Sequence, residues 1–229
     1  MRITNPANKK IDKIMASTLK INEVFYSIQG ETSFSGLPTV FIRLTGCPLR
    51  CGYCDTEYAF NEGEKISIAD ILRKTAIYRT RFVTVTGGEP LAQKNCLNIL
   101  HLLCDEGYQV SLETSGAIDL ADVDSRVCKI VDIKTPGSGE EAKNRWNNLK
   151  HINTTDQIKF VICGRKDYDW AKEKLNEYKL QDRCSEILFS PSHEQLDVTQ
   201  LADWILEDQL PVRLQIQLHK YLWGNVAGK

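Results

Sequence analysis

Long apolar runs, a secretion signal and an excess of one charge are all missing from this sequence. No stretch of its 229 residues is apolar for long enough to span a bilayer, and the N-terminus has no apolar signal-peptide core. The net charge of -1 provides no electrostatic attraction to nucleic acid or acidic lipid. We therefore expect a soluble, cytoplasmic protein with a small-molecule substrate and without a membrane or direct nucleic-acid partner.

The length and the hydrophobic pattern predict a single α/β domain. Hydrophobic residues make up 42% and charged residues 26%, and 229 residues suit one α/β barrel or half-barrel. Residues 1–18 are polar and basic without a clear period, so we predict a flexible N-terminal tail, with a start at Met15 as the alternative. Residues 19–229 are predicted to form the domain.

Short apolar runs alternate with amphipathic stretches from Leu19 onward. Strands are predicted over 19–28, 39–45, 82–86, 108–113, 128–133, 158–163, 186–189 and 212–218. Helices are predicted after an N-cap at Ser67, with Ile68, Ile71, Leu72 and Ile77 near one face, and over 93–106, 168–178 and 198–208. This alternation predicts a parallel sheet whose strand ends form the binding edge.

Three cysteines, Cys47, Cys51 and Cys54, stand in the spacing C-x-x-x-C-x-x-C. Three thiolates in one loop can hold three irons of a 4Fe-4S cluster and leave the fourth iron open, whereas an electron-transfer cluster would require a fourth cysteine nearby. A zinc site is the alternative, but it would also require a fourth ligand: the loop has no histidine, and Asp55 is poorly placed. The remaining thiols are predicted to be buried and structural: Cys96, Cys104, Cys128, Cys163 and Cys184.

Three further loops follow predicted strands and lie at the same edge as the cysteine loop. They are Thr86–Pro90, Glu113–Gly116 and Asp132–Pro136. Gly87 and Gly88 would let the backbone approach a cofactor and present carbonyls to an ammonium group, with the charge of Glu89 beside it. An ordinary strand-to-helix turn is the alternative.

The cysteine motif resembles that of the radical S-adenosylmethionine superfamily, as does the aromatic Tyr53 before the third cysteine. Gly87, Gly88 and Glu89 resemble the segment that holds the methionine amino group. Within this superfamily the chain resembles the 7-carboxy-7-deazaguanine synthases over nearly all residues beyond the tail. The matching segments are 23–31, 41–43, 54–56, 86–90, 132–134 and 218–222.

The resemblance implies a partial TIM-like (β/α) barrel and a role for each matching residue. The cluster ligands would be Cys47, Cys51 and Cys54, and Thr56 would bind Mg²⁺. S-adenosylmethionine would contact Tyr53, Cys54, Asp55, Gly87, Gly88, Glu89, Ser115, Lys134, Thr135 and Pro136. The substrate would contact Ile28, Gln29, Gly30, Glu31, Arg43, Thr86 and His219.

Two of these residues also have simpler interpretations. Arg43 suits a charge-assisted bond to a substrate carboxylate, but a structural ion pair with Glu31 is the alternative. Thr56 would otherwise be taken for a helix cap. Residues 223–229 match no pattern, so it is open whether the end of the chain closes the pocket.

The implied reaction is a radical ring contraction in queuosine and deazapurine biosynthesis. A 5'-deoxyadenosyl radical takes hydrogen from C6 of 6-carboxy-5,6,7,8-tetrahydropterin, which rearranges, recovers a hydrogen and loses ammonia to give 7-carboxy-7-deazaguanine. The enzyme would be a carbon-nitrogen lyase, a homodimer, and reduced by a donor such as flavodoxin or ferredoxin. A glycyl-radical activating enzyme and a zinc-binding module are the alternative classes.

Overall fold

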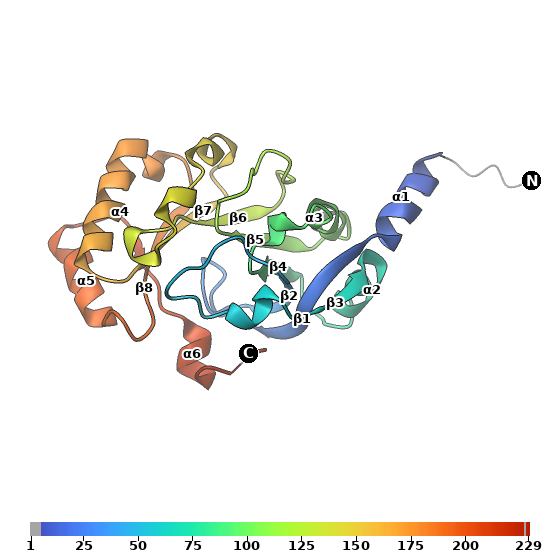
Figure 1. Ribbon diagram of the computed structural model, residues 1–229, viewed down its shortest axis with the longest axis horizontal. Helices are drawn as coiled ribbons and strands as arrows, with labels where there is room; N and C mark the ends of the chain where they lie inside the picture. The colour runs from blue at the N-terminus through green and yellow to red at the C-terminus, as the bar shows by residue number, and fades with distance from the viewer. Residues whose placement is uncertain (1–5, 227) are drawn as a thin grey trace, which may run out of the picture.

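A computed structural model describes residues 6–226 and 228–229, and its centre is one open sheet (Figure 1). Within these residues the nine strands lie in the order β3-β1-β2-β4-β5-β6-β7-β8-β9, with β3 and β9 at the edges. The strands are β1 (Thr18–Ile28), β2 (Pro38–Leu44), β3 (Glu64–Ser67), β4 (Phe82–Gly87), β5 (Gln109–Thr114), β6 (Cys128–Asp132), β7 (Gln157–Ile162), β8 (Glu186–Pro191) and β9 (Arg213–Leu214). The helices are α1 (Pro6–Ala16), α2 (Ile68–Thr75), α3 (Cys96–Asp105), α4 (Arg165–Tyr178), α5 (Val198–Glu207) and α6 (Leu218–Trp223).

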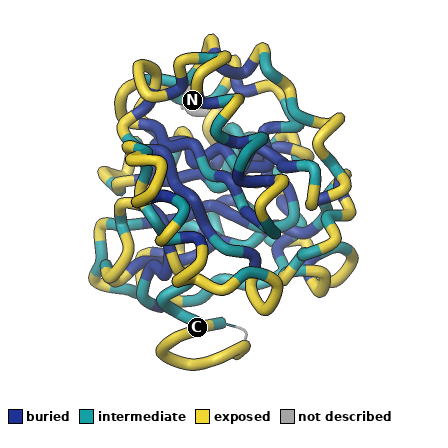
Figure 2. The backbone as a smooth tube through the Cα atoms, turned by 90° about the vertical axis from the view of Figure 1, so that its left-hand side faces the viewer, coloured by how far each residue is buried: buried dark blue, intermediate teal, exposed yellow. Residues whose placement is uncertain are grey.

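Neighbouring strands from β2 to β9 run parallel, which confirms the predicted partial barrel. The central strands are buried along most of their length, as expected for strands covered on both faces, and they include buried polar side chains such as Thr84 in β4 and Lys129 in β6. Figure 2 shows these buried strands inside a layer of exposed loops and helices. The carboxyl ends of the parallel strands therefore meet at one edge, which positions the cysteine loop beside the loops after β4, β5 and β6.

The first strand departs from the predicted parallel pattern. β1 pairs antiparallel with both β2 and β3. The physical reason is the connection: residues 29–37 contain no helix that could return the chain to the same end of the sheet. The segment β3 was also absent from the sequence prediction.

Most predicted helices are present, and their caps agree with the sequence. The Ser67 hydroxyl accepts a hydrogen bond from the Asp70 amide at 3.1 Å, and Ile68 and Ile71 are fully buried. Ile77 was wrongly placed on this buried face: it follows the end of α2 and is 74% exposed. The predicted helix over 93–106 begins later, at Cys96, after a short 3-10 turn at Pro90–Ala92.

Two segments differ from the prediction at the ends of the chain. Residues 6–16 form α1, and Ile14 and Met15 pack against the core, where an irregular tail was expected; residues 1–5 lie outside the described part. The predicted strand over 212–218 is wrong beyond Leu214, because α6 begins at Leu218. No helix in the described residues is both long and apolar enough to cross a membrane.

The β1–β2 connection links opposite parts of the open sheet. The Ser33 amide donates to Oε1 of Gln157 in β7 at 3.0 Å, and the Thr32 amide donates to Oε1 of Gln215, just after β9, at 2.6 Å. Glu31, in the same connection, pairs with Lys159 of β7. Residues 29–37 therefore join the β1 side of the sheet to the β7–β9 side and contribute Gln29, Gly30 and Glu31 to the interior.

Candidate functional site

A cavity of about 670 Å³ lies at the carboxyl ends of the strands. This volume is in the range of small-molecule sites. Most of the predicted site residues line it: Ile28, Gln29, Gly30, Glu31, Arg43, Cys47, Cys51, Tyr53, Cys54, Asp55, Thr56, Thr86, Gly87, Gly88, Ser115, Lys134 and His219. Three predicted cofactor residues are absent from its lining: Glu89, Thr135 and Pro136.

The cysteine loop is held by contacts with the loop after β6. The Gly52 amide donates to the Ser138 carbonyl at 3.0 Å, and the Arg50 amide donates to Oε1 of Glu140 at 2.5 Å. Cys47, Cys51 and Cys54 are free, partly exposed thiols on the cavity wall. Burial raises the pKa of the Cys51 thiol to about 11, so without a metal this thiol stays protonated at neutral pH.

The donor set of this loop fits an iron-sulfur cluster better than a zinc ion. In the part of the chain that the structure describes, no three His, Cys, Asp or Glu side chains converge as ligands of one metal ion. The irons of a 4Fe-4S cluster are separate ligand positions, so three thiolates can each bind a different iron and leave the fourth iron open. Three separate thiols that line one cavity satisfy that requirement.

Gly87 and Gly88 allow the end of β4 to pack tightly against the cysteine loop. A Cβ atom on Gly87 would lie 2.3 Å from the Leu44 carbonyl oxygen, and one on Gly88 would lie 2.4 Å from the Gly46 carbonyl oxygen. Real side chains do not tolerate such distances. The glycines are therefore required by packing of β4 against the end of β2, in addition to their place in the cavity wall.

The Glu89 carboxylate is fully buried and turned to the loop after β5. It accepts hydrogen bonds from the Ser115 amide at 2.8 Å, the Ser115 hydroxyl at 2.5 Å, the Thr114 hydroxyl at 2.9 Å and the Leu91 amide at 3.1 Å. The predicted charge beside the cofactor is thus placed behind the wall, where it orients Ser115. A direct cofactor contact by Glu89 stays a prediction that this geometry does not favour.

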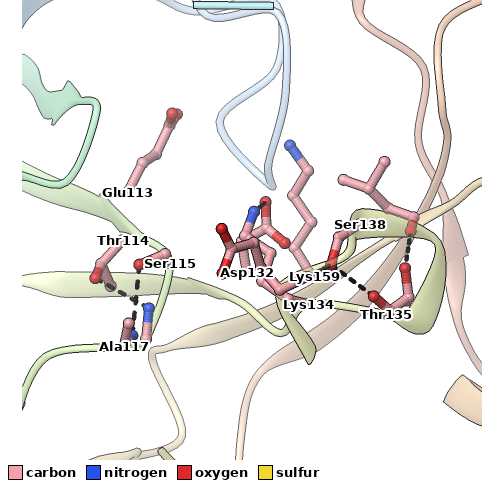
Figure 3. Close-up of polar contacts among 12 residues, drawn as sticks. Glu113, Thr114, Ser115, Ala117, Asp132, Lys134, Thr135, Ser138 and Lys159 are labelled. Carbon is pink, nitrogen blue, oxygen red and sulfur yellow. Dashed lines mark hydrogen bonds and ion pairs between the residues drawn. The ribbon is translucent and has the colours of Figure 1, made fainter. Parts of the chain in front are cut away.

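The end of β6 contributes a lysine and an acid to the cavity wall (Figure 3). Nζ of Lys134 lies 2.9 Å from Oδ2 of Asp132 and 5.6 Å from the centre of the Tyr53 ring. Burial alone would lower the pKa of Lys134, but the charge of Asp132 outweighs it and raises the pKa. Oδ1 of Asp132 and the Tyr53 hydroxyl are buried with no hydrogen-bond partner among the described residues.

Thr135 and Pro136 serve the loop after β6 rather than the cavity wall. The Thr135 hydroxyl donates to the Val161 carbonyl at 2.9 Å or to Asp167 at 3.1 Å. The buried Asp167 also accepts from the Gly137 amide at 2.8 Å. This network fixes the segment that contacts Gly52 of the cysteine loop.

Glu31 and Glu113 provide carboxyl groups at the other end of the cavity. Glu31 forms an ion pair with Lys159, whose charge outweighs the effect of burial and lowers the pKa of Glu31. Glu113 accepts from the Thr86 hydroxyl at 3.0 Å and from Nε2 of Gln29 at 3.4 Å, and it makes no ion pair with any described residue. Burial and the charge of Glu31 raise the pKa of Glu113.

Arg43 forms a structural ion pair, but its partner is Glu23 and not Glu31 as the sequence-based alternative predicted. Nε of Arg43 lies 2.7 Å from Oε1 of Glu23, its neighbour across the β1–β2 pairing. The guanidinium group also lies 5.9 Å from the centre of the Phe25 ring and 5.8 Å from that of Tyr58. Strand register, which places Glu23 opposite Arg43, decides this pair.

Thr56 does not act as a side-chain cap. It precedes the 3-10 turn Glu57–Phe60, but its hydroxyl donates to Oδ1 of Asp55 at 2.8 Å and makes no capping bond. Oδ2 of Asp55 accepts from Nε2 of Gln217 and Nζ of Lys220, each at 3.0 Å. Burial would raise the pKa of Asp55, but the charge of Lys220 and these hydrogen bonds lower it well below its usual range.

Several residues of the cavity wall had no role predicted from the sequence. Glu113, Asp132 and Lys220 lay in segments expected near the site, whereas Lys159 and Gln217 were not predicted there at all. Lys159 carried a usable signal, because a charged side chain interrupts the otherwise apolar core of β7. The end of the chain also reaches the site: Gly224, Asn225, Val226, Gly228 and Lys229 line the cavity.

Comparison with known proteins agrees with this arrangement. The model of the Radical SAM superfamily matches residues 41–191. A 7-carboxy-7-deazaguanine synthase of Koribacter versatilis (strain Ellin345) is 42% identical over 219 residues, which cover 90% of this chain and 97% of the relative. One of Chlorobaculum tepidum is 44% identical over 212 residues, which cover 91% of this chain and 96% of the relative.

A solved structure shares the fold. The crystal structure of QueE from Escherichia coli matches with a TM-score of 0.72 at 27% identity, over 88% of this chain and 95% of that one. The chain belongs to the radical S-adenosylmethionine superfamily and, within it, to the family of 7-carboxy-7-deazaguanine synthases.

Proposed function

We propose that this protein converts 6-carboxy-5,6,7,8-tetrahydropterin to 7-carboxy-7-deazaguanine and ammonia. One observation carries the proposal: a single cavity brings the three-cysteine loop, Thr56 and the polar residues of the β1–β2 connection together. When bound, the 4Fe-4S cluster and S-adenosylmethionine supply reductive cleavage of the cofactor and abstraction of a substrate hydrogen. The protein's own residues bind, orient and shield the reactants.

The cofactor end of the cavity is formed by the loops after β2, β4, β5 and β6. Cys47, Cys51 and Cys54 would hold the cluster. Ser115, fixed by Glu89, and Lys134, paired with Asp132, would contact S-adenosylmethionine beside the backbone of Gly87 and Gly88. Because these groups are already oriented by protein partners, cofactor binding requires little reorganisation.

The substrate end offers groups that match a carboxylated pterin. Gln29 and Glu31 provide amide and carboxylate groups for the aminopyrimidinone edge, and Arg43 provides a guanidinium group for the carboxylate. Burial lowers the pKa of His219, so its imidazole is neutral at neutral pH and can donate one hydrogen bond and accept another.

Thr56 is the proposed magnesium ligand. Its hydroxyl donates a hydrogen bond to Asp55, which leaves the lone pairs of Oγ1 available for a cation. Mg²⁺ accepts oxygen ligands and keeps several waters, so one protein oxygen together with a substrate carboxylate is a reasonable set. An electron donor such as flavodoxin or ferredoxin and a homodimer stay predictions supported by the family resemblance, and a cytoplasmic location stays a prediction from the sequence, which has no apolar signal-peptide core.

An anaerobic assay tests the reaction. The iron-reconstituted protein is mixed with S-adenosylmethionine, magnesium, a chemical reductant and the carboxytetrahydropterin, and the absorbance of the deazaguanine product is followed. We expect product formation that depends on the cofactor and on reductant. An intact cluster that cleaves S-adenosylmethionine but yields no deazaguanine would overturn the substrate assignment and leave superfamily membership unaffected.

A further inference from the structure

The side chain of Gln217 lies between two carboxylates of the cavity. Its Nε2 is 2.9 Å from Oε1 of Glu31 and 3.0 Å from Oδ2 of Asp55. A side-chain amide has two N–H groups, so it can donate one to each acid at the same time. Gln217 is therefore a bridge between these two carboxylates.

The two acids need such a bridge because their negative charges oppose each other. The charge of Asp55 acts against ionisation of Glu31 and raises its pKa, while Lys159 lowers it. Lys159 balances the charge of Glu31, and Lys220 balances that of Asp55. Each lysine contacts one acid, whereas Gln217 contacts both.

The bridge joins segments with different tasks. Glu31 belongs to the β1–β2 connection, which forms the substrate end. Asp55 follows the cysteine loop and accepts a hydrogen bond from the Thr56 hydroxyl. The backbone strengthens the link, since the Leu218 amide donates to the Gly30 carbonyl at 2.9 Å. The start of α6 is thus bonded to both segments.

We propose that Gln217 is a positioning residue that couples the pterin-binding end of the cavity to the magnesium end. Through Glu31 it orients the groups for the pterin ring, and through Asp55 it orients the hydroxyl of Thr56. This inference rests on the proposed function, because it concerns the same substrate and cation.

Anaerobic calorimetry distinguishes effects on the two ends of the cavity. It measures binding of the pterin to the reconstituted enzyme in the presence of S-adenosylmethionine. Titrations without added magnesium report the ring contacts, and a magnesium series reports the cation end. Gln217→Met keeps the length of the side chain and removes both hydrogen bonds. Lys220→Met removes a partner of Asp55 alone, and Gln200→Met on the exposed surface of α5 is the matched control for the change of residue type.

We expect Gln217→Met to weaken magnesium-free pterin binding about tenfold and to raise the half-saturating magnesium concentration about tenfold, because charge-assisted bonds are lost at both ends. Lys220→Met should raise only the magnesium requirement. Gln200→Met should match the wild type. If Gln217→Met unfolds, Gln217→Glu replaces it: this variant keeps the shape, adds a third negative charge and should weaken both parameters.

Two results would overturn the inference: Gln217 variants that match Gln200→Met in both titrations, or Gln217 variants that match Lys220→Met and leave magnesium-free binding unchanged. Failure of the proposed function is distinguishable, because the wild type would then not bind or convert the pterin.

Discussion

The imidazole of His219 occupies the space that a side chain on Gly30 would need. A Cβ atom built on Gly30 would lie 2.0 Å from Nδ1 of His219, and 3.0 Å from its backbone nitrogen. The two residues come from opposite ends of the chain and line the same cavity. Close approach of α6 to the β1–β2 connection is therefore built into the site.

Gly30→Ala should displace His219 and weaken substrate binding. The added methyl group contacts both the ring and the backbone of α6, so the helix start has to move. We expect the KM for the pterin to rise about tenfold or more, in line with loss of one or two oriented hydrogen bonds. Cluster content should not change. Gly164→Ala is the control, because nothing lies within 4 Å of its Cβ position; equal effects of both variants would contradict the steric explanation.

Cys51→Ala should abolish both cluster assembly and activity. The thiol lies on the cavity wall, whereas Cys104 is a partly buried thiol outside it. Iron and sulfide analysis with the visible spectrum after reconstitution measures the outcome. Cys104→Ala is expected to bind the same amount of iron as the wild type, and a full cluster in Cys51→Ala would exclude it as a ligand.

Thr56→Ala should separate cofactor cleavage from product formation. The variant retains the three cysteines and loses the hydroxyl that donates to Asp55, together with the γ-methyl group. We expect 5'-deoxyadenosine to form while deazaguanine formation falls by about tenfold or more, because the substrate carboxylate loses its cation. Full wild-type turnover without added magnesium would show that Thr56 has another role.

Glu89→Gln should destabilise the fold and weaken cofactor binding together. The carboxylate accepts bonds from Thr114 and Ser115 while fully buried, and an amide would turn an N–H group toward these donors. We expect a loss of about 1–3 kcal/mol in the free energy of unfolding. Denaturant unfolding measures the loss of stability, and a titration with S-adenosylmethionine measures the loss of cofactor binding. Glu106→Gln, at an exposed position, should leave both unchanged.

Glu113 should make stability fall as the pH rises. Burial and the charge of Glu31 raise its pKa above the ordinary value of 4.5, so the folded protein holds this proton more tightly than the unfolded chain does. The stabilisation is complete below pH 4.5 and is lost as the pH rises through the folded-state pKa. Glu113→Gln removes the titration, so its stability relative to the wild type should increase from about pH 5 to pH 8. A difference that stays constant across this range would disprove the raised pKa.

The arrangement of strands and helices followed from local pattern wherever burial was complete. The short segments of β4 and β6, rich in β-branched residues, are buried on both faces, so the sequence predicted these strands closely. The pattern failed at the ends of the chain. The α1 segment showed no clear period in the sequence although its Ile14 and Met15 pack against the core, and Gln215 and Gln217 are held by side-chain contacts with the β1–β2 connection.

The chemistry of the site was determined by the sequence itself, because the spacing of Cys47, Cys51 and Cys54 sets how many thiolates one loop can offer to a cluster. Only the tertiary structure decided which charges meet: Arg43 with Glu23, Glu31 with Lys159, and Asp55 with Lys220. These partners depend on strand register and on the path of α6 across the cavity. Such contacts between distant segments leave no local pattern in the chain.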